Sequence, residues 1–282
     1  MLHQVFEFDW KAWCDISSAD RNRIVRDTLP VIQELERAAS DNSMEQSALY
    51  SLLGHKGDIM MLHLRDSLHS LNQVELTLSR TRLFQFFNAK YSYLSVVELG
   101  LYDSSVKTYA ALAEKGVEQH TPEWNEVIGD VLSRQRGAMS QRLYPSIPPT
   151  KYLCFYPMDR RRGETVNWYA LPITERQRLM HNHGMIGRRY ADRVRQVISG
   201  SIGLDDWEWG VDLFADDPLV FKQLIYEMRF DEASSMYATF GSFYTGIRLP
   251  LTKLRNGYPA VSTRMNEAWS KGRGHACCGC KI

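Results

Sequence analysis

The sequence lacks the signatures of several large protein classes. No run approaches the roughly 18 consecutive apolar residues that a membrane-spanning helix needs. No GxGxxG motif, Walker loop, GxSxG motif or HExxH motif is present, so nucleotide-binding and hydrolase functions have no support. The net charge of +1 over 282 residues creates no overall field that would attract nucleic acid or an acidic membrane.

Cysteine is scarce, and its pattern excludes a disulfide scaffold. The count is five, and an odd number is not typical of a disulfide framework. The N-terminal stretch MLHQVFEFDWKAW also lacks the basic and apolar regions of a secretory signal. We therefore expect a reduced, cytoplasmic setting. Near the C-terminus, His275, Cys277, Cys278 and Cys280 resemble a soft-metal cluster, and an incidental tail is the alternative.

Aromatic residues, by contrast, are plentiful. The chain has 14 Tyr, 11 Phe and 7 Trp, which are enough to line a wide apolar cavity or to fill two cores. Its 44% hydrophobic and 24% charged residues are ordinary for a globular protein. The length suits one large domain or two of ordinary size.

Hydrophobic periodicity predicts the same order of elements twice. Alternation favours strands, and apolar residues three or four apart favour helices. Residues 1–102 then predict the order β-α-β-β-α-β, with a strand over 5–12, a helix to about 39, strands over 47–53 and 58–64, a helix over 67–87 and a strand over 91–102. Residues 151–250 repeat that order, with a strand over 151–158, a helix over 173–198, strands over 198–202 and 207–215, a helix over 218–230 and a strand over 240–249.

Residues 103–150 predict a connector, partly helical over 122–139, and residues 251–282 a mobile tail. The repeated order predicts an α+β fold of two tandem ferredoxin-like βαββαβ units. Their sheets could face each other as one β-barrel with the helices outside.

The stretch from Cys154 to Gln196 organises the rest of the chain. On a helix, His183 shares its face with Met180, Gly187, Tyr190 and Val194, so its imidazole is expected to point inward. Each nearby helical glycine costs about 1 kcal/mol against alanine. A flat haem bound through His183 would explain that cost. A core histidine whose ring is satisfied by a backbone carbonyl is the alternative.

The strand before that helix carries a tyrosine and a run of arginines. Tyr156 and Met158 are two residues apart and share a face, expected to be the barrel interior, and Arg160 continues the alternation at the rim. A redox tyrosine and an ordinary core tyrosine are both compatible with this position. Guanidinium groups suit carboxylates, so a polycarboxylate ligand could use some of the cations Arg142, Arg160, Arg161, Arg162 and Arg229. For Arg161 and Arg162 we favour a solvated face.

The runs YPMDRRRGETVNWYALPITERQRLMHNHG and DEASSMYATFGSFYTGIRLP resemble the coproheme decarboxylases, within the chlorite-dismutase-like haem proteins. The resemblance is strong over residues 142–249 and weaker over 50–102. It implies two ferredoxin-like units per subunit, forming a dimeric α+β barrel, and usually a homopentamer. It also implies that iron coproporphyrin III is both substrate and redox cofactor. Hydrogen peroxide would oxidise two propionates to vinyl groups, giving haem b and carbon dioxide.

The resemblance also assigns roles to individual residues. His183 falls on the axial ligand of the iron, and Tyr156 on the catalytic tyrosine that passes an oxidising equivalent to a propionate as a tyrosyl radical. Arg160 takes the place of a family lysine, which leaves the timing of the second decarboxylation open because the two cations differ in geometry. The substrate-contacting positions would be Arg142, Tyr156, Pro157, Met158, Asp159, Arg160, Gln196, Arg229 and Ser234.

Gln196 separates the hypotheses within this family. Chlorite dismutases place an arginine there to hold chlorite anions, a role that a neutral amide would serve poorly. The resemblance therefore favours decarboxylation over a chlorite dismutase or a broad haem peroxidase. A haem-binding protein without turnover remains the alternative from another class; it would need His183 and the arginines but not Tyr156.

Overall fold

The computed structural model describes residues 1–37, 45–98, 112–114, 116–118 and 120–249, except for the side chains of residues 37, 131, 132 and 134–142. Within this part, the chain divides into two compact units. One unit comprises residues 2–92 with 246–249, and the other comprises residues 93–245 with Met1. Among the described helices, none combines the length and the apolar character needed to cross a membrane.

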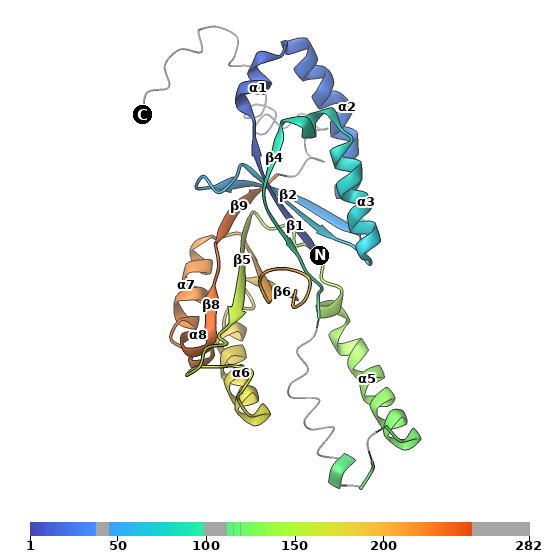
Figure 1. Cartoon of the computed structure of the whole chain (residues 1–282), viewed down its shortest axis with the longest axis vertical. Helices are drawn as coiled ribbons and strands as arrows, with labels where there is room; N and C mark the ends of the chain where they lie inside the picture. The colour runs from blue at the N-terminus through green and yellow to red at the C-terminus, as the bar shows by residue number, and fades with distance from the viewer. Residues whose placement is uncertain (38–44, 99–111, 115, 119, 250–282) are drawn as a thin grey trace. The chain divides into compact units, whose positions relative to one another are not determined.

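The unit of residues 2–92 follows the predicted order of elements (Figure 1). Its elements are β1 (Leu2–Phe8), α1 (Trp10–Asp15), α2 (Ser18–Arg37), β2 (Gln46–Leu53), β3 (Ile59–Leu64), α3 (Leu68–Ser79), the 3-10 helix η2 (Arg82–Phe86) and β4 (Phe87–Leu94). The strands lie in the order β4-β1-β3-β2, and β3 is antiparallel to both β1 and β2.

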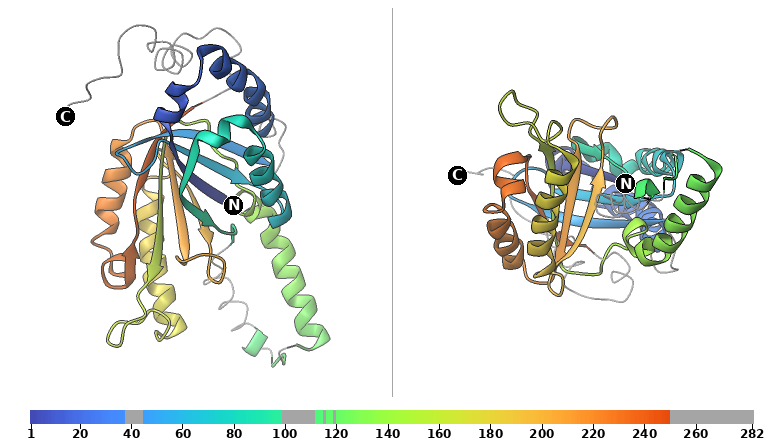
Figure 2. Two further views of the ribbon diagram at one scale, coloured as in Figure 1. Left: turned by 45° about the horizontal axis from the view of Figure 1, so that its top comes forward. Right: turned by 90° about the horizontal axis from the view of Figure 1, so that it is seen from below.

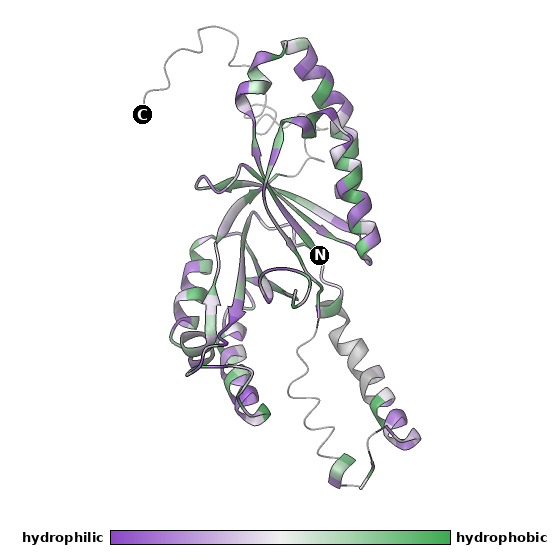
Figure 3. Ribbon diagram, viewed as in Figure 1, coloured by the Kyte–Doolittle hydropathy of each residue, from purple (hydrophilic) through white to green (hydrophobic). Residues whose placement is uncertain are grey.

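The core of this unit lies between the sheet and its helices. Both α2 and α3 carry hydrophobic and hydrophilic residues along their length, as Figure 3 shows. Their apolar sides bury Ile24 and Leu78 against the strand residues Phe6, Leu49 and Met61. This burial favours the packed arrangement, because removing apolar surface from water is worth roughly 25 cal/mol per Å².

The first strand is shorter than the alternation over residues 5–12 predicts. β1 ends at Phe8 because Asp9 begins a helix: its carboxylate accepts a hydrogen bond of 2.9 Å from the Ala12 backbone N–H. An aspartate in this capping position satisfies a donor that the first helical turn leaves unpaired. The strand predicted over 91–102 likewise lies earlier, as β4, and its last four residues fall outside the described part.

The unit of residues 93–245 carries the second set of elements. They are α5 (Pro122–Leu143), β5 (Tyr152–Arg160), α6 (Ile173–Arg188), β6 (Arg195–Gly200), β7 (Trp209–Ala215), α7 (Leu219–Met228), α8 (Glu232–Tyr237), β8 (Ala238–Phe240) and the start of β9 (Tyr244–Arg248). The strands lie in the antiparallel order β8-β5-β7-β6, which is the order of the other unit. The repeated order that the sequence predicted is therefore present, while the barrel and the homopentamer stay predictions.

The two faces of this second sheet differ in what covers them. Helices α6, α7 and α8 lie on one side of the strands (Figure 2). The other side buries Tyr93, whose ring contacts Phe155 at 5.5 Å between centroids and whose hydroxyl lies 2.5 Å from the Ser201 hydroxyl. Burial raises the pKa of the Tyr93 phenol, so it remains neutral.

The helix predicted over residues 173–198 is wrong in its last ten residues. α6 ends at Arg188, a tight turn follows, and residues from Arg195 form strand β6. Pairing with β7 places Arg195 opposite Phe214 and Ile198 opposite Val211. Val194, Val197 and Ile198 are β-branched and suit a pleated strand, and the sheet partner decides the outcome over the local helical spacing.

Gly210 on β7 tests how tightly this sheet is packed. A Cβ there would overlap the Tyr93 ring and lie 3.2 Å from the Ser199 hydroxyl. We expect Gly210→Ala to lower the free energy of unfolding by about 1–3 kcal/mol, the usual cost of overpacking a core. Urea unfolding measures the change, and Gly129→Ala of the helix Pro122–Leu143 is the control: a Cβ there meets nothing within 4 Å, so this variant should lose no stability. Equal stability of Gly210→Ala and the unchanged protein would contradict this packing.

Candidate functional site

The candidate site lies on the face of the second sheet that α6 and α7 cover. The register of the three central strands places Tyr156 opposite Val211, and Val211 opposite Ile198, so these three side chains share one face. Tyr156 belongs to the buried cluster that contains Val220 and Leu224 of α7. The expectation that Tyr156 faces a barrel interior is therefore wrong: strand alternation turns it toward the helices.

The same face carries an apolar strip that is open in part. The row next to Tyr156 joins Met158, Trp209 and Phe240, all partly exposed. Ile198 is 50% exposed although it belongs to a central row of this face. Large apolar side chains left partly open on the inner side of a sheet suit an apolar ligand.

The Tyr156 phenol is enclosed by aromatic rings. Its ring stacks on Phe243, with centroids 4.5 Å apart and 27° between the planes, and it contacts Phe240 at 5.8 Å. Among the described residues its hydroxyl has no hydrogen-bond partner. Burial is the main cause that raises the pKa of this phenol, and the nearby Arg229 cation opposes that shift. Tyr156 is therefore a neutral phenol with its O–H available to a ligand.

His183 is held by a carboxylate. Its Nδ1 lies 2.9 Å from Oδ2 of Asp231 and 3.4 Å from the Ser234 hydroxyl, and its side chain is 23% exposed. The alternative of a core histidine bound to a backbone carbonyl is not what the structure shows. A carboxylate at Nδ1 fixes the tautomer with the proton on Nδ1, which leaves the Nε2 lone pair for a metal ion.

Asp231 is itself fixed by the start of α8. Its Oδ1 accepts a hydrogen bond of 2.9 Å from the Ala233 backbone N–H, which caps that helix. Burial acts to raise the pKa of Asp231, but the hydrogen bonds from His183 and Ser234 outweigh it, so the pKa lies below its ordinary value. The carboxylate is therefore charged at neutral pH and is a strong acceptor for the imidazole N–H.

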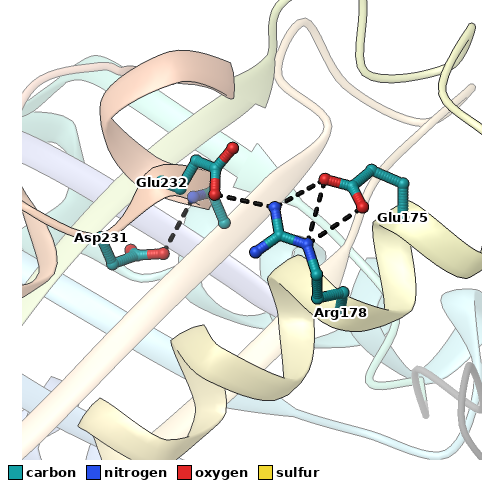
Figure 4. Close-up of polar contacts among 5 residues, drawn as sticks. Glu175, Arg178, Asp231 and Glu232 are labelled. Carbon is teal, nitrogen blue, oxygen red and sulfur yellow. Dashed lines mark hydrogen bonds and ion pairs between the residues drawn. The ribbon is translucent and has the colours of Figure 1, made fainter.

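A second contact joins α6 to α8 beside this pair. Arg178 of α6 donates to Glu175 one turn earlier and to Glu232 at 2.8 Å, as Figure 4 shows. The three side chains are exposed in large part, so the ion pairs contribute little to stability. They join α6 to α8 at the residue next to Asp231.

Arg160 does not lie at a rim as predicted, because its side chain is only 8% exposed. Its guanidinium stacks over the Trp168 ring at 4.4 Å. It also donates to the Ala233 carbonyl oxygen at 3.0 Å and to the Met180 sulfur at 3.2 Å. These contacts join the strand of Tyr156 to α6 and α8, the two helices that hold His183 and Asp231.

Three of the predicted cations are at the surface: Arg229, and Arg161 and Arg162 of the basic run. Arg229 is exposed and lies 3.9 Å from the Phe240 ring, so its charge stands beside the aromatic cluster around Tyr156. Arg161 and Arg162 are exposed, as we favoured, and Arg162 approaches the buried Glu208 at 3.5 Å. Of these three cations, Arg229 is the one placed to meet an anionic ligand near Tyr156.

Gln196 reaches the site from a strand instead of the histidine helix. It pairs with Leu213 on β6, and its Nε2 lies 3.4 Å from the point that a Cβ on Gly187 would occupy. Gly187 is one turn beyond His183 on α6. The structure therefore brings Gln196 next to the histidine helix, although the local prediction placed it in the wrong element.

The remaining predicted residues do not gather on this face. Pro157 and Asp159 alternate with Tyr156 and Met158 and so point to the opposite side of β5. Asp159 accepts a hydrogen bond from the Glu208 backbone N–H at 2.8 Å. Arg142 belongs to α5, and its side chain lies outside the described part, as does the cysteine-rich tail.

Sequence reasoning missed three residues that the structure brings to the site. Asp231 could have been found, because Asp-Glu-Ala-Ser is a helix-starting pattern that places the carboxylate at a cap. Trp168 and Phe243 carry no such local signal, because each contacts a partner outside its own segment: Trp168 contacts Arg160 of β5, and Phe243 contacts Tyr156. Their positions follow only from the folded chain.

Comparisons with known proteins agree with this fold. Residues 21–249 match the chlorite dismutase family, and the chain belongs to that family. Its fold is α+β with an antiparallel sheet. A solved structure described as a novel haem-binding protein from Thermus thermophilus is 37% identical, with a TM-score of 0.74; the match covers 90% of this chain and 92% of that one.

Two variant chlorite dismutase structures from Candidatus Nitrospira defluvii are more distant. One is 17% identical with a TM-score of 0.65, covering 89% of this chain and 92% of that one. The other is 19% identical with a TM-score of 0.64, covering 89% and 91%. At these identities the likeness shows a shared fold.

Gly184 and Gly187 give a first prediction for the histidine helix. A Cβ at Gly184 meets nothing within 4 Å, whereas one at Gly187 touches Gln196 and Met228 at 3.4 Å. We expect Gly184→Ala to raise the free energy of unfolding by about 0.5–1 kcal/mol, because alanine favours the helical backbone. Gly187→Ala is the matched comparison and should gain less. Urea unfolding measures both, and a loss of stability in Gly184→Ala would be incompatible with the open space seen here.

Asp231→Asn tests the carboxylate that holds His183. The lowered pKa of Asp231 means that its stabilising contribution is present above about pH 4, the ordinary unfolded value, and is lost as the pH falls through the folded pKa. We expect the variant to be less stable at pH 7 by about 1.5–3 kcal/mol, the range for hydrogen bonds to charged groups. The difference should shrink in acid. Asparagine can still cap α8, so the variant tests the charge of Asp231 rather than its capping role. A stability difference in urea unfolding that does not change with pH would argue against a role for this charge.

Proposed function

We propose that this protein binds an iron porphyrin through His183 and uses hydrogen peroxide to decarboxylate two propionates of iron coproporphyrin III, giving haem b. The observation that carries the proposal is the pairing of two groups in one unit. His183 has its Nδ1 held by Asp231, and Tyr156 is a neutral buried phenol on the sheet face that the histidine helix covers. The haem-binding relative at 37% identity and the family membership support it.

The residues present fit such a group. One imidazole with a free Nε2 suits a metal that brings its other ligands, as iron in a porphyrin does. The partly open strip of Met158, Ile198 and Trp209 suits a flat apolar ring. Arg229 offers a guanidinium to a carboxylate at the edge of this strip. For Arg142, the contact with the substrate that the resemblance implies stays a prediction.

The reaction balances with peroxide as the only oxidant. Each propionate loses a hydrogen from its β-carbon and its carboxyl group as carbon dioxide, which leaves a vinyl group, two electrons and one proton. One peroxide takes up two electrons and two protons and becomes two waters. The bound iron supplies the redox chemistry that couples these two halves.

This chain's own residues would guide the transfer. Tyr156 loses its hydroxyl hydrogen, and the resulting tyrosyl radical takes the hydrogen from the propionate β-carbon. Its neutral, buried state keeps that hydrogen in place until oxidation. Asp231 keeps the Nδ1 proton of His183 in place, so that Nε2 remains the ligand atom. The Ser234 hydroxyl lies 3.4 Å from Nδ1 of His183 and so stands on the histidine side; the propionate contact that the resemblance implies for it stays a prediction.

A chlorite dismutase or broad haem peroxidase is the alternative within the family. Gln196 argues against it, because a neutral amide beside Gly187 offers no charge to hold chlorite. A haem carrier without turnover is the alternative from another class. It gives no role to Tyr156, whose hydroxyl has no hydrogen-bond partner in the described part and lies on the face that the histidine helix covers.

Porphyrin mass measures the proposed activity directly. Purified protein is mixed with iron coproporphyrin III, peroxide is added, and the porphyrin is followed by mass spectrometry. We expect loss of two carboxyl groups, slowed about 100-fold or more in Tyr156→Phe, which is typical when a proton-transferring group is removed. Tyr152→Phe is the matched control, because it removes a hydroxyl from the same face of the same strand.

Each other result would contradict a different part of the proposal. An unchanged porphyrin mass with a bound Soret band would reject decarboxylation and favour a carrier. Breakdown of chlorite with an unchanged mass would favour the dismutase alternative. A Soret band in His183→Ala identical to that of the unchanged protein would remove His183 as the ligand.

A further inference from the structure

The segment between β8 and β9 is pressed closely onto β5. The Gly241 N–H donates to the Pro157 carbonyl oxygen at 2.9 Å. A Cβ at Gly241 would lie 2.8 Å from the Pro157 side chain and 2.9 Å from the Trp207 ring. Only glycine allows this close approach, and the approach fixes the segment that carries Phe243 beside the middle of β5.

We propose that Phe243 is a positioning residue for Tyr156: its ring sets the orientation of the reacting phenol and keeps water from it. The proposal rests on the proposed function, in which Tyr156 reacts. Stacking at 4.5 Å and 27° places the Phe243 ring over one face of the tyrosine. Phe240 adds a second ring at 5.8 Å from Tyr156 and stacks with Phe243 at 6.3 Å.

Packing has to orient this phenol, because no hydrogen bond in the described residues does so. A tyrosine side chain turns about two bonds, and a ring stacked on one face restricts both rotations. Arg229 lies on Phe240, so the cluster is closed on that side by a cation–π contact of 3.9 Å. A hydrogen transfer is sensitive to such orientation, and a misplacement of about 1 Å can cost about 100-fold in rate.

We expect the same ring to contribute to the burial that affects how the phenol ionises. Burial raises the pKa of Tyr156, with smaller effects from Cys154, Arg229 and Asp212. Removing the Phe243 ring would let water reach the phenol and lower its pKa toward the ordinary value near 10. This change can be measured without any bound porphyrin.

The test compares Phe243→Leu and Phe243→Tyr with a matched control. Phe221→Leu removes the same atoms from the same core cluster but lies on α7, where no ring contact joins Phe221 to Tyr156. The first readout is the ionisation of Tyr156 in protein without porphyrin, by ultraviolet titration with the Tyr156→Phe curve subtracted. We expect a lowered pKa of Tyr156 in Phe243→Leu and the unchanged value in Phe221→Leu; Phe243→Tyr is kept for the second readout, because its added phenol would titrate as well.

The second readout is the reaction itself. We expect Phe243→Leu to lower kcat for decarboxylation about tenfold or more while the Kd for iron coproporphyrin III changes less than about twofold. Electron paramagnetic resonance of the tyrosyl radical should change shape, because coupling to the β-methylene hydrogens depends on ring orientation. Phe243→Tyr keeps the ring and should keep kcat and Kd unchanged.

The outcomes separate this inference from the proposed function. Equal ionisation curves for Phe243→Leu and Phe221→Leu would overturn the positioning role, whether or not the protein decarboxylates anything. Decarboxylation unaffected by Tyr156→Phe would overturn the proposed function instead. If Phe243→Leu does not fold, Gly241→Ala is the second variant: it pushes the segment off β5 with the ring retained, and it should lower the pKa of Tyr156 and kcat in the same direction.

Discussion

A single buried arginine joins the parts of this site. The Arg160 guanidinium stacks on Trp168 and donates to the Ala233 carbonyl oxygen, with Met180 as a further contact. A desolvated cation–π contact is worth about 2 kcal/mol, and a hydrogen bond from a charged group about 1.5–3 kcal/mol. Arg160 lies at the end of β5, and its guanidinium contacts both α6 and α8. It therefore fixes the strand of Tyr156 against the two helix segments that carry His183 and Asp231. Lysine, with a point charge and no planar fork, could not make this set of contacts.

The second constraint is the register of the antiparallel strands. Opposite residues share a face, so the pairing of Tyr156 with Val211 and of Val211 with Ile198 decides which side chains line the site. A shift by one residue would turn Tyr156 away from the helices and bring Pro157 or Phe155 there instead. The same register leaves Met158, Trp209 and Phe240 partly open, which is where a flat ligand would lie. Sheet pairing and the arginine therefore act together: one selects the face, and the other holds the helices over it.

Much of the architecture could be predicted from periodicity, since both units show the β-α-β-β-α-β order that the sequence indicates. The predicted ends of helices and strands were wrong where a partner far away in the sequence decides the local structure. Residues 189–198 keep a helical spacing, yet pairing with β7 makes Gln196 part of a strand, and this still brings it beside Gly187. Strand alternation placed Tyr156 and Met158 on one face but could not say which face the helices cover. Arg160 was expected at a rim because arginine is usually exposed. The aromatic and carbonyl partners that make its burial favourable come from Trp168 and Ala233, which lie outside its own strand.

Periodicity and long motifs are properties of neighbouring residues, so they were enough to predict the order of elements, the family and the types of residue that can do chemistry. The contacts of Asp231 with His183 and of Phe243 with Tyr156, and the burial of Arg160, became known from the folded chain alone. Each of these contacts joins residues from different elements of the chain. Such contacts depend on the packing of strands and helices against one another, and no local pattern records that packing.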